Sequence, residues 1–300
     1  MGTNFSFAAF VMTYKRPLIL KETIRKIINQ SHYPSKILII DNDPECSAKD
    51  IQLEFSETEV CYYAVGYNSG PAGAAKLGLE ILSNEGYQWI AWMDDDDPPI
   101  FENTFEILLK IATSNDNCGC VGTVGQYFNK KNGLMIRVAD SELEGSGTLT
   151  VDNIAGGMCK IVNANVCLKD KIYPDETLFY GFEELDFDIR LQKAGYLLLT
   201  DRELYKKHRI HYNRIDLNTK RGSIKQLSRL WREYYSTRNS LIILCKNNLR
   251  ITFLKAIFRY FIKIFIGFRF GFRYGFYNAK IISKGLFDFA IGKYGQVNFK

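Results

Sequence analysis

Short apolar runs alternate with helical patterns along the first part of the chain. Four runs bounded by breaker residues predict buried strands, at 5–11, 36–40, 60–64 and 89–93. Between them, Pro17 opens an amphipathic helix in the first-turn position where proline is tolerated, and a second helix runs from Gly73 through Leu82. This alternation predicts an α/β, Rossmann-like fold with a mostly parallel central sheet and helices on both of its faces.

The pattern continues beyond residue 100 with weaker signals. It predicts a helix at 102–114, a strand at 120–124, turn-rich hairpins at 126–149, a strand at 158–166, a helix from 183 to near Gly195 and a strand at 196–199. Gly156 and Gly157 stand directly before one of these strands. Paired glycines allow a ligand or another strand to approach the backbone closely, and both interpretations stay open.

Four consecutive aspartates, Asp94 to Asp97, follow the aromatic strand at 89–93. Adjacent like charges repel, and a carboxylate beside a folded core loses hydration unless a positive group compensates for it. Carboxylates on a loop suit Mg²⁺ or Mn²⁺, which complete their coordination with substrate phosphates. The stretch therefore predicts a metal and nucleotide site, and an acidic surface turn or helix start is the alternative.

Polar residues also follow the first two predicted strands. Thr13 and Arg16 lie in the loop after the first strand, and Asp41 ends the second. Because ligands bind at the carboxyl ends of the strands in open α/β sheets, we expect these loops to converge with the aspartates at one edge.

A second acidic group opens the helix predicted at 183, where Glu183, Glu184 and Asp186 follow Gly181. Acidic side chains are favoured at a helix N-terminus for electrostatic reasons alone. A glycine directly before them also suits a backbone that borders a pocket. Both a structural and a catalytic role are therefore open for these acids.

Composition limits the class of protein. The chain has 300 residues, of which 46% are hydrophobic and 24% charged, and this excludes global disorder. Its seven cysteines have no paired CxxC spacing, which disfavours a disulfide framework or a zinc site and favours a reducing cytoplasm. The apolar patch at 5–12 is short and lacks a basic lead-in, so we expect no signal peptide.

The net charge of +6 is concentrated in the last part of the chain. Residues 246–300 contain eleven Lys and Arg and a single acid, Asp288. Lys255, Arg259 and Lys263 recur at steps of four among Phe and Ile, which predicts a basic stripe on an interfacial helix. The alternative is a helix packed on the rest of the protein with solvated lysines. No uninterrupted apolar span of membrane-crossing length occurs, and no nucleic-acid motif accompanies the charge.

Seven motifs across residues 6–240 together resemble family 2 glycosyltransferases. They are TYKRP at 13–17, IIDND at 39–43, NSGPAG at 68–73, WMDDDDPP at 92–99, GGM at 156–158, FEELDF at 182–187 and YYSTRN at 234–239. Their order and spacing are most similar to the galactofuranosyl- and rhamnosyltransferase-like members of bacterial envelope biosynthesis. The resemblance implies a GT-A fold, a nucleotide-diphosphate sugar donor, UDP- or dTDP-linked, a divalent Mg²⁺ or Mn²⁺, and inversion at the anomeric carbon.

The resemblance also implies roles for individual residues. Glu184 matches the general base, although the family often writes this pair as ED, so Glu183 stays an alternative. The residues implied to contact the nucleotide sugar are Thr13, Arg16, Asp41, Asp94, Asp95 and Gly157. Those implied to bind the metal are Asp94, Asp96 and His208, with His211 as the rival histidine. Residues implied to support the site or the acceptor are Glu183, Asp186 and Arg238.

These observations predict an inverting, metal-dependent transferase that moves galactofuranose or rhamnose onto a hydroxyl of a cell-envelope glycan or lipid-linked acceptor. We expect a catalytic domain at 1–240 and a helical region at 241–300 that binds an anionic membrane surface, on the cytoplasmic face of the plasma membrane. No nucleic-acid partner is expected. A nucleotidyltransferase and a non-catalytic glycan-binding module are the alternatives.

Overall fold

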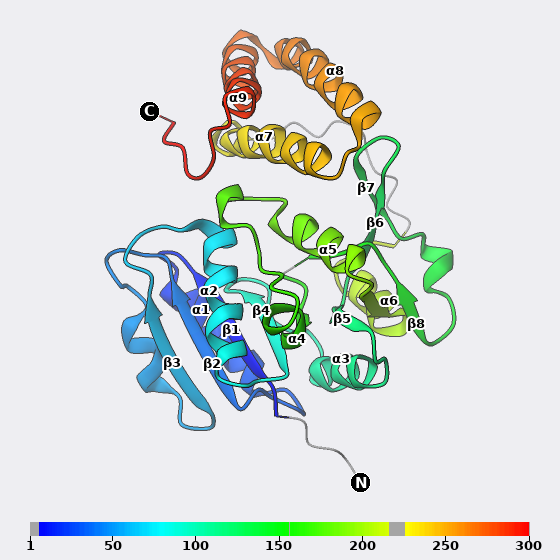
Figure 1. The fold of residues 1–300 in the computed structure, drawn as a ribbon. Coiled ribbons are helices and arrows are strands. Elements are labelled where there is room, and N and C mark those ends of the chain that lie inside the picture. Colours follow the sequence, from blue (N-terminus) through cyan, green and yellow to red (C-terminus); the bar gives the residue numbers. More distant parts are fainter. Residues whose placement is uncertain (1–5, 156, 216–225, 300) are drawn as a thin grey trace.

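An eight-stranded sheet forms the centre of the computed structural model, which describes residues 6–155, 157–215 and 226–299 (Figure 1). The strand order is β3-β2-β1-β4-β10-β5-β11-β8. β10 is antiparallel to both of its neighbours and β8 is antiparallel to β11, while the other pairings are parallel. The predicted mostly parallel sheet is confirmed. Its strands are β1 Ala8–Thr13, β2 Lys36–Asp41, β3 Glu59–Ala64, β4 Trp89–Asp94, β5 Cys118–Val121, β8 Thr148–Thr150, β10 Lys160–Asn163 and β11 Leu197–Asp201.

Both faces of this sheet are buried, because the central strands are apolar at every position rather than at alternate ones. In β1, Phe10 packs into the core on one face and Val11 into the core on the other. In β4, Trp92 likewise packs into the core on the first face and Met93 into the core on the second. Continuous apolar strands are what a parallel sheet covered on both sides requires.

Helices cover the two faces, as the sequence predicts. α1 Pro17–Ile28 and α3 Thr104–Thr113 pack on one side. α2 Gly70–Asn84, α4 Ala164–Leu168 and α5 Glu183–Lys193 pack on the other, and α6 Arg202–His211 follows β11. Among the described residues before α7 there are also four short 3₁₀ turns. They are η1 Lys49–Glu54, η2 Asp140–Leu143, η3 Glu176–Leu178 and η4 Leu227–Arg229.

The strand predicted at 158–166 is wrong at its C-terminal end. β10 stops at Asn163, and α4 begins at Ala164. The Asn163 side chain accepts a hydrogen bond from the backbone N–H of Asn165, so it caps the helix and ends the strand.

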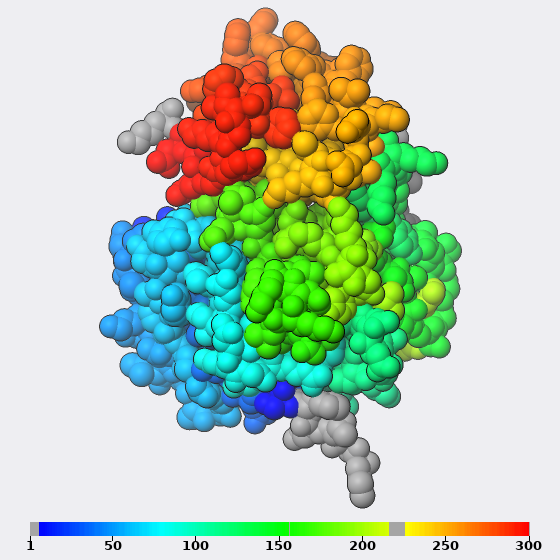
Figure 2. Space-filling view, viewed as in Figure 1, coloured from blue at the N-terminus to red at the C-terminus, as the bar shows by residue number. Residues whose placement is uncertain are grey.

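A helical layer lies over α5, on the side away from the N-terminus (Figures 1 and 2). It consists of α7 Trp231–Lys246, α8 Arg250–Ile266, the turn η5 Gly267–Phe270 and α9 Phe272–Ala290. Leu185 and Ile189 of α5 share one apolar cluster with Leu241 of α7 and Ile282 of α9. The layer is therefore packed on the sheet domain through a common core, and α7 continues through residues 240 and 241 without a break.

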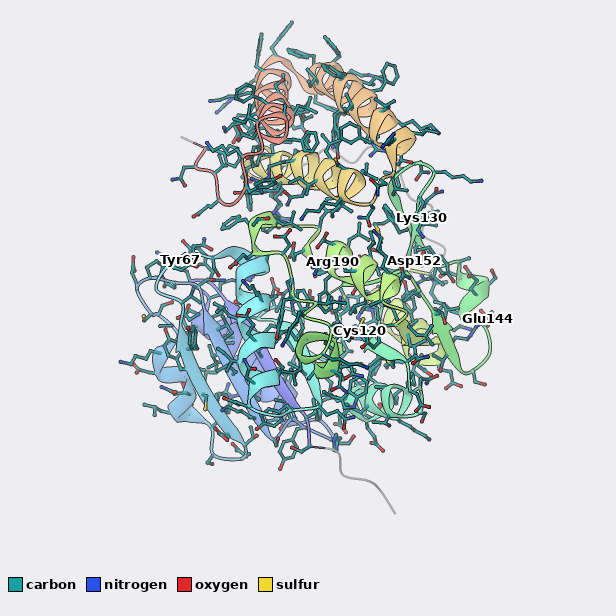
Figure 3. The ribbon with its side chains drawn as sticks, viewed as in Figure 1. Tyr67, Cys120, Lys130, Glu144, Asp152 and Arg190 are labelled. Carbon is teal, nitrogen blue, oxygen red and sulfur yellow. The ribbon has the colours of Figure 1, made fainter. Side chains whose placement is uncertain are left out.

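A small three-stranded sheet supports this layer from the side. It contains β6 Gly125–Asn129, β7 Leu134–Arg137 and β9 Asn153–Ile154 in the order β7-β6-β9. In Figure 3, Lys130 and Glu144 lie at the periphery of this region, whereas Cys120 of β5 lies among the side chains of the interior. The hairpin β6–β7 reaches the helical layer beside α8 (Figure 1).

The predicted basic stripe of α8 is directed toward the protein. Lys255 and Arg259 donate hydrogen bonds to the carbonyl oxygens of Lys131 and Asn132 in the β6–β7 turn, at 3.4 and 2.9 Å. The third member, Lys263, forms an ion pair with Glu233 of α7. The outward face of α8 is apolar instead, with seven large side chains that are between 42% and 72% exposed: Ile251, Leu254, Phe258, Phe261, Ile262, Phe265 and Ile266.

Three large apolar side chains of α9, those of Phe272, Phe276 and Phe287, are also 62% to 78% exposed. Within the residues that the structure describes, no helix combines the length and the apolar character needed to cross a membrane.

Candidate active site

A cavity of about 690 Å³ lies where the parallel strands end, between the sheet and the helical layer. The loops that follow β1, β2 and β4 all reach it, so the predicted convergence of these loops is observed. The N-terminus of α5, the start of α7 and the C-terminal segment complete the walls. The lining residues are Met12, Thr13, Tyr14, Arg16, Asn42, Asn68, Gly70, Pro71, Asp94, Asp96, Phe179, Tyr180, Gly181, Glu183, Glu184, Trp231, Arg232, Tyr235, Gln296, Val297 and Phe299.

Thr13, Arg16 and Asp95 form one polar cluster beside this cavity. The Thr13 hydroxyl donates a hydrogen bond of 2.7 Å to Asp95 Oδ2. Arg16 forms an ion pair with the fully buried Asp95 and donates a hydrogen bond of 2.6 Å to Asp96. The loop after β1 therefore holds the acidic loop after β4 in place, and the ion pairs of Arg16 go to Asp95 and Asp96.

The acidic loop carries more negative charge than the surrounding groups compensate. Asp94 keeps some exposed surface, but enclosure of its carboxyl group, followed by the nearby charge of Glu184, raises its pKa to about 8. Burial raises the pKa of Asp95 to about 6, although Thr13 and Arg16 act in the opposite direction. A cation at this position would favour the ionised form of both groups.

The carboxylates fit a divalent metal ion. Oxygen atoms of Asp94, Asp96 and Asp97 come within 4.8 Å of one another, and hard oxygen ligands are those that Mg²⁺ and Mn²⁺ prefer. Gly157 lies against them, since a Cβ atom there would stand 2.5 Å from Asp97 Oδ2 and 3.1 Å from Asp94 Oδ2. The glycine thus allows the backbone to approach the acids directly, while Gly156 lies outside the described residues.

Asp97 was absent from our sequence-based choice of metal-binding residues, although it is the fourth member of the same aspartate run. His208, which was included, lies in a small neighbouring cavity with Asp97 and Gly157. Burial, followed by the charges of Arg214 and His211, lowers the pKa of His208 to about 4, so its imidazole is neutral, as a metal ligand must be. Among the described residues, the acidic cluster itself does not include this histidine.

His211, the rival histidine, takes a different position. Its ring meets Phe101 edge to face at 6.3 Å and borders a separate surface cavity beside Asp96. It is exposed, whereas His208 is 6% exposed. Of the two histidines, only His208 shares a cavity with Gly157.

Glu183 and Glu184 face the same cavity from the first turn of α5. Gly181 and Phe182 just before them both have left-handed backbone conformations, with φ of +74° and +73°. Such a conformation strains a phenylalanine, so the surrounding structure must hold this turn in place.

The two glutamates have different environments. Glu183 is 5% exposed, and its Oε2 atom has no hydrogen-bond partner among the described residues. Burial, followed by the charge of Glu184, raises the pKa of Glu183 well above its usual range. Glu184 is half-buried and lies close enough to Asp94 to raise the pKa of that carboxyl group as well.

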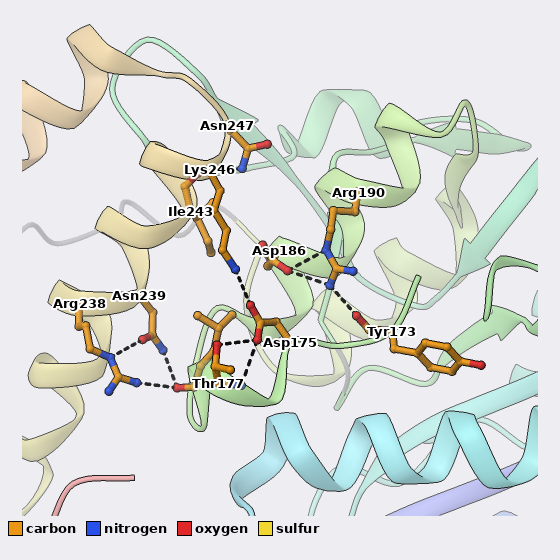
Figure 4. A network of polar contacts seen from close by, with 11 residues as sticks. Tyr173, Asp175, Thr177, Asp186, Arg190, Arg238, Asn239, Ile243, Lys246 and Asn247 are labelled. Carbon is orange, nitrogen blue, oxygen red and sulfur yellow. Dashed lines mark hydrogen bonds and ion pairs between the residues drawn. The ribbon is translucent and has the colours of Figure 1, made fainter. Parts of the chain in front are cut away.

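Arg238 and Asn239 of α7 hold the strained turn (Figure 4). Both side chains are fully buried. The Asn239 amide group contacts the carbonyl oxygens of Leu178, Tyr180 and Gly181 at 2.9 to 3.0 Å, and Arg238 donates a second hydrogen bond to that of Leu178. Arg238 therefore supports the site from behind and does not line the cavity.

Two other predicted residues serve the structure around the site. Asp186 forms an ion pair of 2.8 Å with Arg190, which also donates to the Tyr173 carbonyl oxygen (Figure 4). Asp41 is fully buried and accepts hydrogen bonds from the Asp43 and Ala48 N–H groups and the Tyr62 hydroxyl. Neither side chain lines the cavity, and Asn42 lines it beside Asp41.

Sequence reasoning missed the aromatic and C-terminal part of the cavity. Trp231 and Arg232 stand just before the YYSTRN motif, and their closeness to this motif is the signal that could have identified them. Val297 and Phe299 lie more than 110 residues beyond Glu184 and carry no motif. Only the fold brings the C-terminal segment back to the acidic loop.

The comparisons with known proteins agree with this geometry. Residues 9–156 match the family model "Glycosyl transferase family 2". The galactofuranosyltransferase GlfT1 of Mycolicibacterium smegmatis is 23% identical over 198 residues, which cover 62% of this chain and 65% of that protein. The dTDP-rhamnosyl transferase RfbF of Shigella flexneri is 23% identical over 261 residues, which cover 82% of each chain. The chain thus spans slightly less than two thirds of the GlfT1 sequence.

Solved structures share the fold. The mannosyltransferase PcManGT from Pyrobaculum calidifontis, in complex with GDP-Man and Mn²⁺, has a TM-score of 0.58 at 12% identity, covering 96% of this chain and 87% of its own. GalNAc-T7 with UDP, GalNAc and Mn²⁺ has a TM-score of 0.56 at 14% identity, covering 67% of this chain and 43% of its own. The chain therefore carries a glycosyl transferase family 2 domain on a GT-A fold.

Proposed function

We propose that this chain is an inverting glycosyltransferase that moves a sugar from a nucleotide-diphosphate donor to an acceptor hydroxyl. The observation that carries the proposal is the meeting of two acidic groups in one cavity: the loop with Asp94 and Asp96, and Glu184 at the start of α5. A metal-binding acid cluster and a separate carboxylate are what this reaction needs at its two reacting ends.

Each group has a distinct part in the proposed reaction. Thr13 and Arg16, with Asp95, position the nucleotide end of the donor, and Gly157 leaves room beside the acids. Asp94, Asp96 and Asp97 would hold Mg²⁺ or Mn²⁺, with His208 as a further ligand. When bound, the cation offsets the negative charge that develops on the departing diphosphate.

Glu184 acts as the base in this mechanism. It accepts the proton of the acceptor hydroxyl while the oxygen attacks the anomeric carbon from the face opposite the diphosphate. A single displacement inverts that carbon. Glu183 is the poorer base, because it is 5% exposed and burial, followed by the charge of Glu184, raises the pKa of its carboxyl group, which favours the protonated form.

The relatives guide the choice of donor. One is named a galactofuranosyltransferase and another a dTDP-rhamnosyl transferase, so UDP-galactofuranose and dTDP-rhamnose are the donors that we favour, with a cell-envelope glycan or lipid-linked sugar as acceptor. Two structural neighbours were solved with Mn²⁺, together with UDP or GDP-Man, which supports a nucleotide-linked donor and a divalent ion.

The test measures donor cleavage across UDP-, dTDP- and GDP-sugars with Mn²⁺, for the wild type, Glu184→Gln and Glu183→Gln. Release of a nucleoside diphosphate is expected, and Glu184→Gln should lower turnover by about two to four orders of magnitude while donor affinity persists. Release of pyrophosphate would identify a nucleotidyltransferase instead, and no turnover of any donor would leave a binding module. If only Glu183→Gln abolishes turnover, the base is Glu183.

We also propose that the chain works at the cytoplasmic face of the plasma membrane, held there by α8 and α9. Their outward apolar side chains suit the interfacial zone of a bilayer, and exposed Arg269, Arg273 and Lys280 suit anionic lipid headgroups. The only acid of this region, Asp288, is buried and bonded to Tyr234. A second copy of this face would repel the first, since both carry the same charge.

Vesicle co-sedimentation of point variants tests this attachment. Phe258→Ser with Phe265→Ser should abolish binding to anionic vesicles, because both side chains are more than two thirds exposed on α8. Lys255→Ser is the matched control, since Lys255 lies on the same helix but contacts the β6–β7 turn. Equal binding by the double phenylalanine variant and the wild type would refute the proposed attachment face.

A further inference from the structure

The cavity has two chemically different sides. Asp94, Asp96, Glu183 and Glu184 supply carboxyl groups on the side formed by the sheet and α5. The opposite side is formed by α7 and the turn before α5, and it is aromatic and contains an arginine. The proposed reaction uses residues of the acidic side, and it assigns no role to residues of the aromatic side.

Three aromatic rings, which we call the platform, lie against one another there, with interplanar angles between 55° and 89°. Tyr180 and Trp231 have ring centroids 4.8 Å apart, and each lies 5.9 Å from the ring of Tyr235. Tyr180 and Trp231 are only half-buried, so part of the platform faces the cavity. A saccharide ring has apolar C–H faces that pack well on such surfaces, while its hydroxyl groups stay free to react.

Arg232 lies over this platform. Its guanidinium carbon is 5.4 Å from the centroid of Tyr180 and 5.5 Å from that of Trp231. Arg16, the other arginine of the cavity, is engaged with Asp95 and Asp96, whereas no carboxylate pairs with Arg232 in the described ranges of the chain. A guanidinium that is fixed by stacking and left without an acid suits a phosphate group.

The C-terminal segment forms the wall beside the platform, with Val297 and Phe299 facing the cavity. It is held by specific bonds rather than by loose contact. The Arg238 Nη1 atom donates to the Gly295 carbonyl oxygen at 2.9 Å, and the Val297 N–H donates to the Tyr235 hydroxyl at 3.0 Å. The side is therefore a built part of the cavity.

We infer that this aromatic side is the acceptor subsite, and that it takes a saccharide bearing a phosphate or diphosphate. The sugar ring packs on Tyr180 and Trp231, the phosphate binds Arg232, and the reacting hydroxyl points toward Glu184. The inference rests on the proposed function, since an acceptor exists only for a transferase. A lipid-linked diphosphate sugar and a soluble sugar phosphate share this chemistry.

Trp231 provides the readout. Trp89 and Trp92 are 3% and 1% exposed within β4, so among the three tryptophans only Trp231 faces the cavity. The probes are glucose 1-phosphate, decyl-diphosphoglucose and the uncharged decyl β-glucoside. Each is titrated by tryptophan fluorescence in the presence of saturating UDP and Mn²⁺, which occupy the donor side, and the signal of Trp231→Phe is subtracted.

Both phosphate-bearing probes should bind the wild type more tightly than decyl β-glucoside does. Arg232→Ala should weaken their binding by about tenfold and leave that of the uncharged glucoside unchanged. Arg229→Ala is the matched control, because Arg229 is exposed one turn earlier and does not line the cavity. Tighter binding of the decyl diphosphate indicates a lipid-linked acceptor, and equal binding of the two phosphates indicates a soluble one.

The inference is overturned if no probe binds the wild type, or if Arg232→Ala binds the phosphate probes as the wild type does. It is also overturned if their binding disappears once UDP is present, because Arg232 would then serve the donor diphosphate. Failure of the proposed function has a different signature, namely the absence of nucleoside diphosphate release in the donor assay, which requires no acceptor.

Discussion

The turn before α5 should depend on one amide side chain, that of Asn239. Its nitrogen is the donor to the carbonyl oxygens of Tyr180 and Gly181. It shares the Leu178 oxygen with Arg238, and Figure 4 draws both of these side chains. Asn239→Ala therefore removes the hydrogen-bond donor of two carbonyl groups, and it also removes the Oδ1 atom that accepts a bond of 3.0 Å from Arg238 Nε. The Leu178 oxygen keeps its bond from Arg238. The turn also contains Phe182 in a left-handed conformation, which is stable only while its neighbours hold it.

The expected loss of stability and of turnover follows from the lost hydrogen bonds and from the strain at Phe182. A buried carbonyl that loses its partner costs about 1 to 3 kcal/mol, and water can reach these partly buried groups, so the two together should destabilise the fold by about 2 to 3 kcal/mol. Strain of about 1 to 2 kcal/mol at Phe182 then favours relaxation of the turn. Because each 1.4 kcal/mol is a factor of about ten, the competent position of Glu184 should become about five- to thirtyfold rarer.

Two measurements separate this effect from general damage. Urea unfolding should give the loss of stability, and donor assays should give a turnover reduced about five- to thirtyfold with donor affinity nearly unchanged, since Thr13, Arg16 and the acidic loop are untouched. Asn247→Ala is the matched control at the C-terminal end of α7, because the Asn247 side chain donates a hydrogen bond to the Ile243 carbonyl oxygen of that helix. If Asn239→Ala stays within about 0.5 kcal/mol of the wild type and keeps its turnover, the turn is held by other contacts.

Gly157→Ala should weaken Mn²⁺ binding without unfolding the protein, because the added methyl group would stand 2.5 Å from Asp97 Oδ2. If calorimetry gives an unchanged Mn²⁺ affinity, Asp97 is not a metal ligand. Excess EDTA should abolish donor cleavage, and retained activity would refute a metal requirement. The metal-free protein should lose stability as pH rises from about 5 to about 8. Burial, followed by the charge of Glu184, raises the pKa values of Asp94 and Glu183 in the folded state. In this pH range the folded state therefore holds protons that the unfolded state has released. Melting temperatures measured against pH should show this slope in EDTA and a smaller one with Mn²⁺, and a slope of the opposite sign would refute the raised values.

The sheet was predictable because its signals are local. Each central strand is a continuous apolar run ended by acids or breakers, and the loops after β1, β2 and β4 must meet because the strands are parallel. The same local signals predict the shared position of Thr13, Arg16, Asp94 and Asp96, all of which line the cavity. The error at residues 164–166 is also local, since the capping side chain of Asn163 outweighs the apolar pattern that continues beyond it.

The orientation of α8 was not predictable from its own sequence. The period of four correctly placed Lys255, Arg259 and Lys263 on one stripe. Which way that stripe points depends on the carbonyl groups of the β6–β7 turn and on Glu233, all distant in sequence. A periodic pattern fixes the faces of a helix, but only its partners decide which face is turned inward.

The role of the C-terminal segment in the cavity wall was not predictable from the sequence for a similar reason. It has no motif, and its importance comes from the position that α7 gives it. Arg238 donates hydrogen bonds to the carbonyl oxygen of Leu178, before α5, and to that of Gly295 in the C-terminal segment, so one buried side chain fixes both walls of the cavity. Removing everything after α7 would therefore delete a cavity wall together with the outward face of α8. A truncation that lost membrane binding and activity at once could not separate these causes, whereas Phe258 and Phe265 lie on the outward face alone and can separate them.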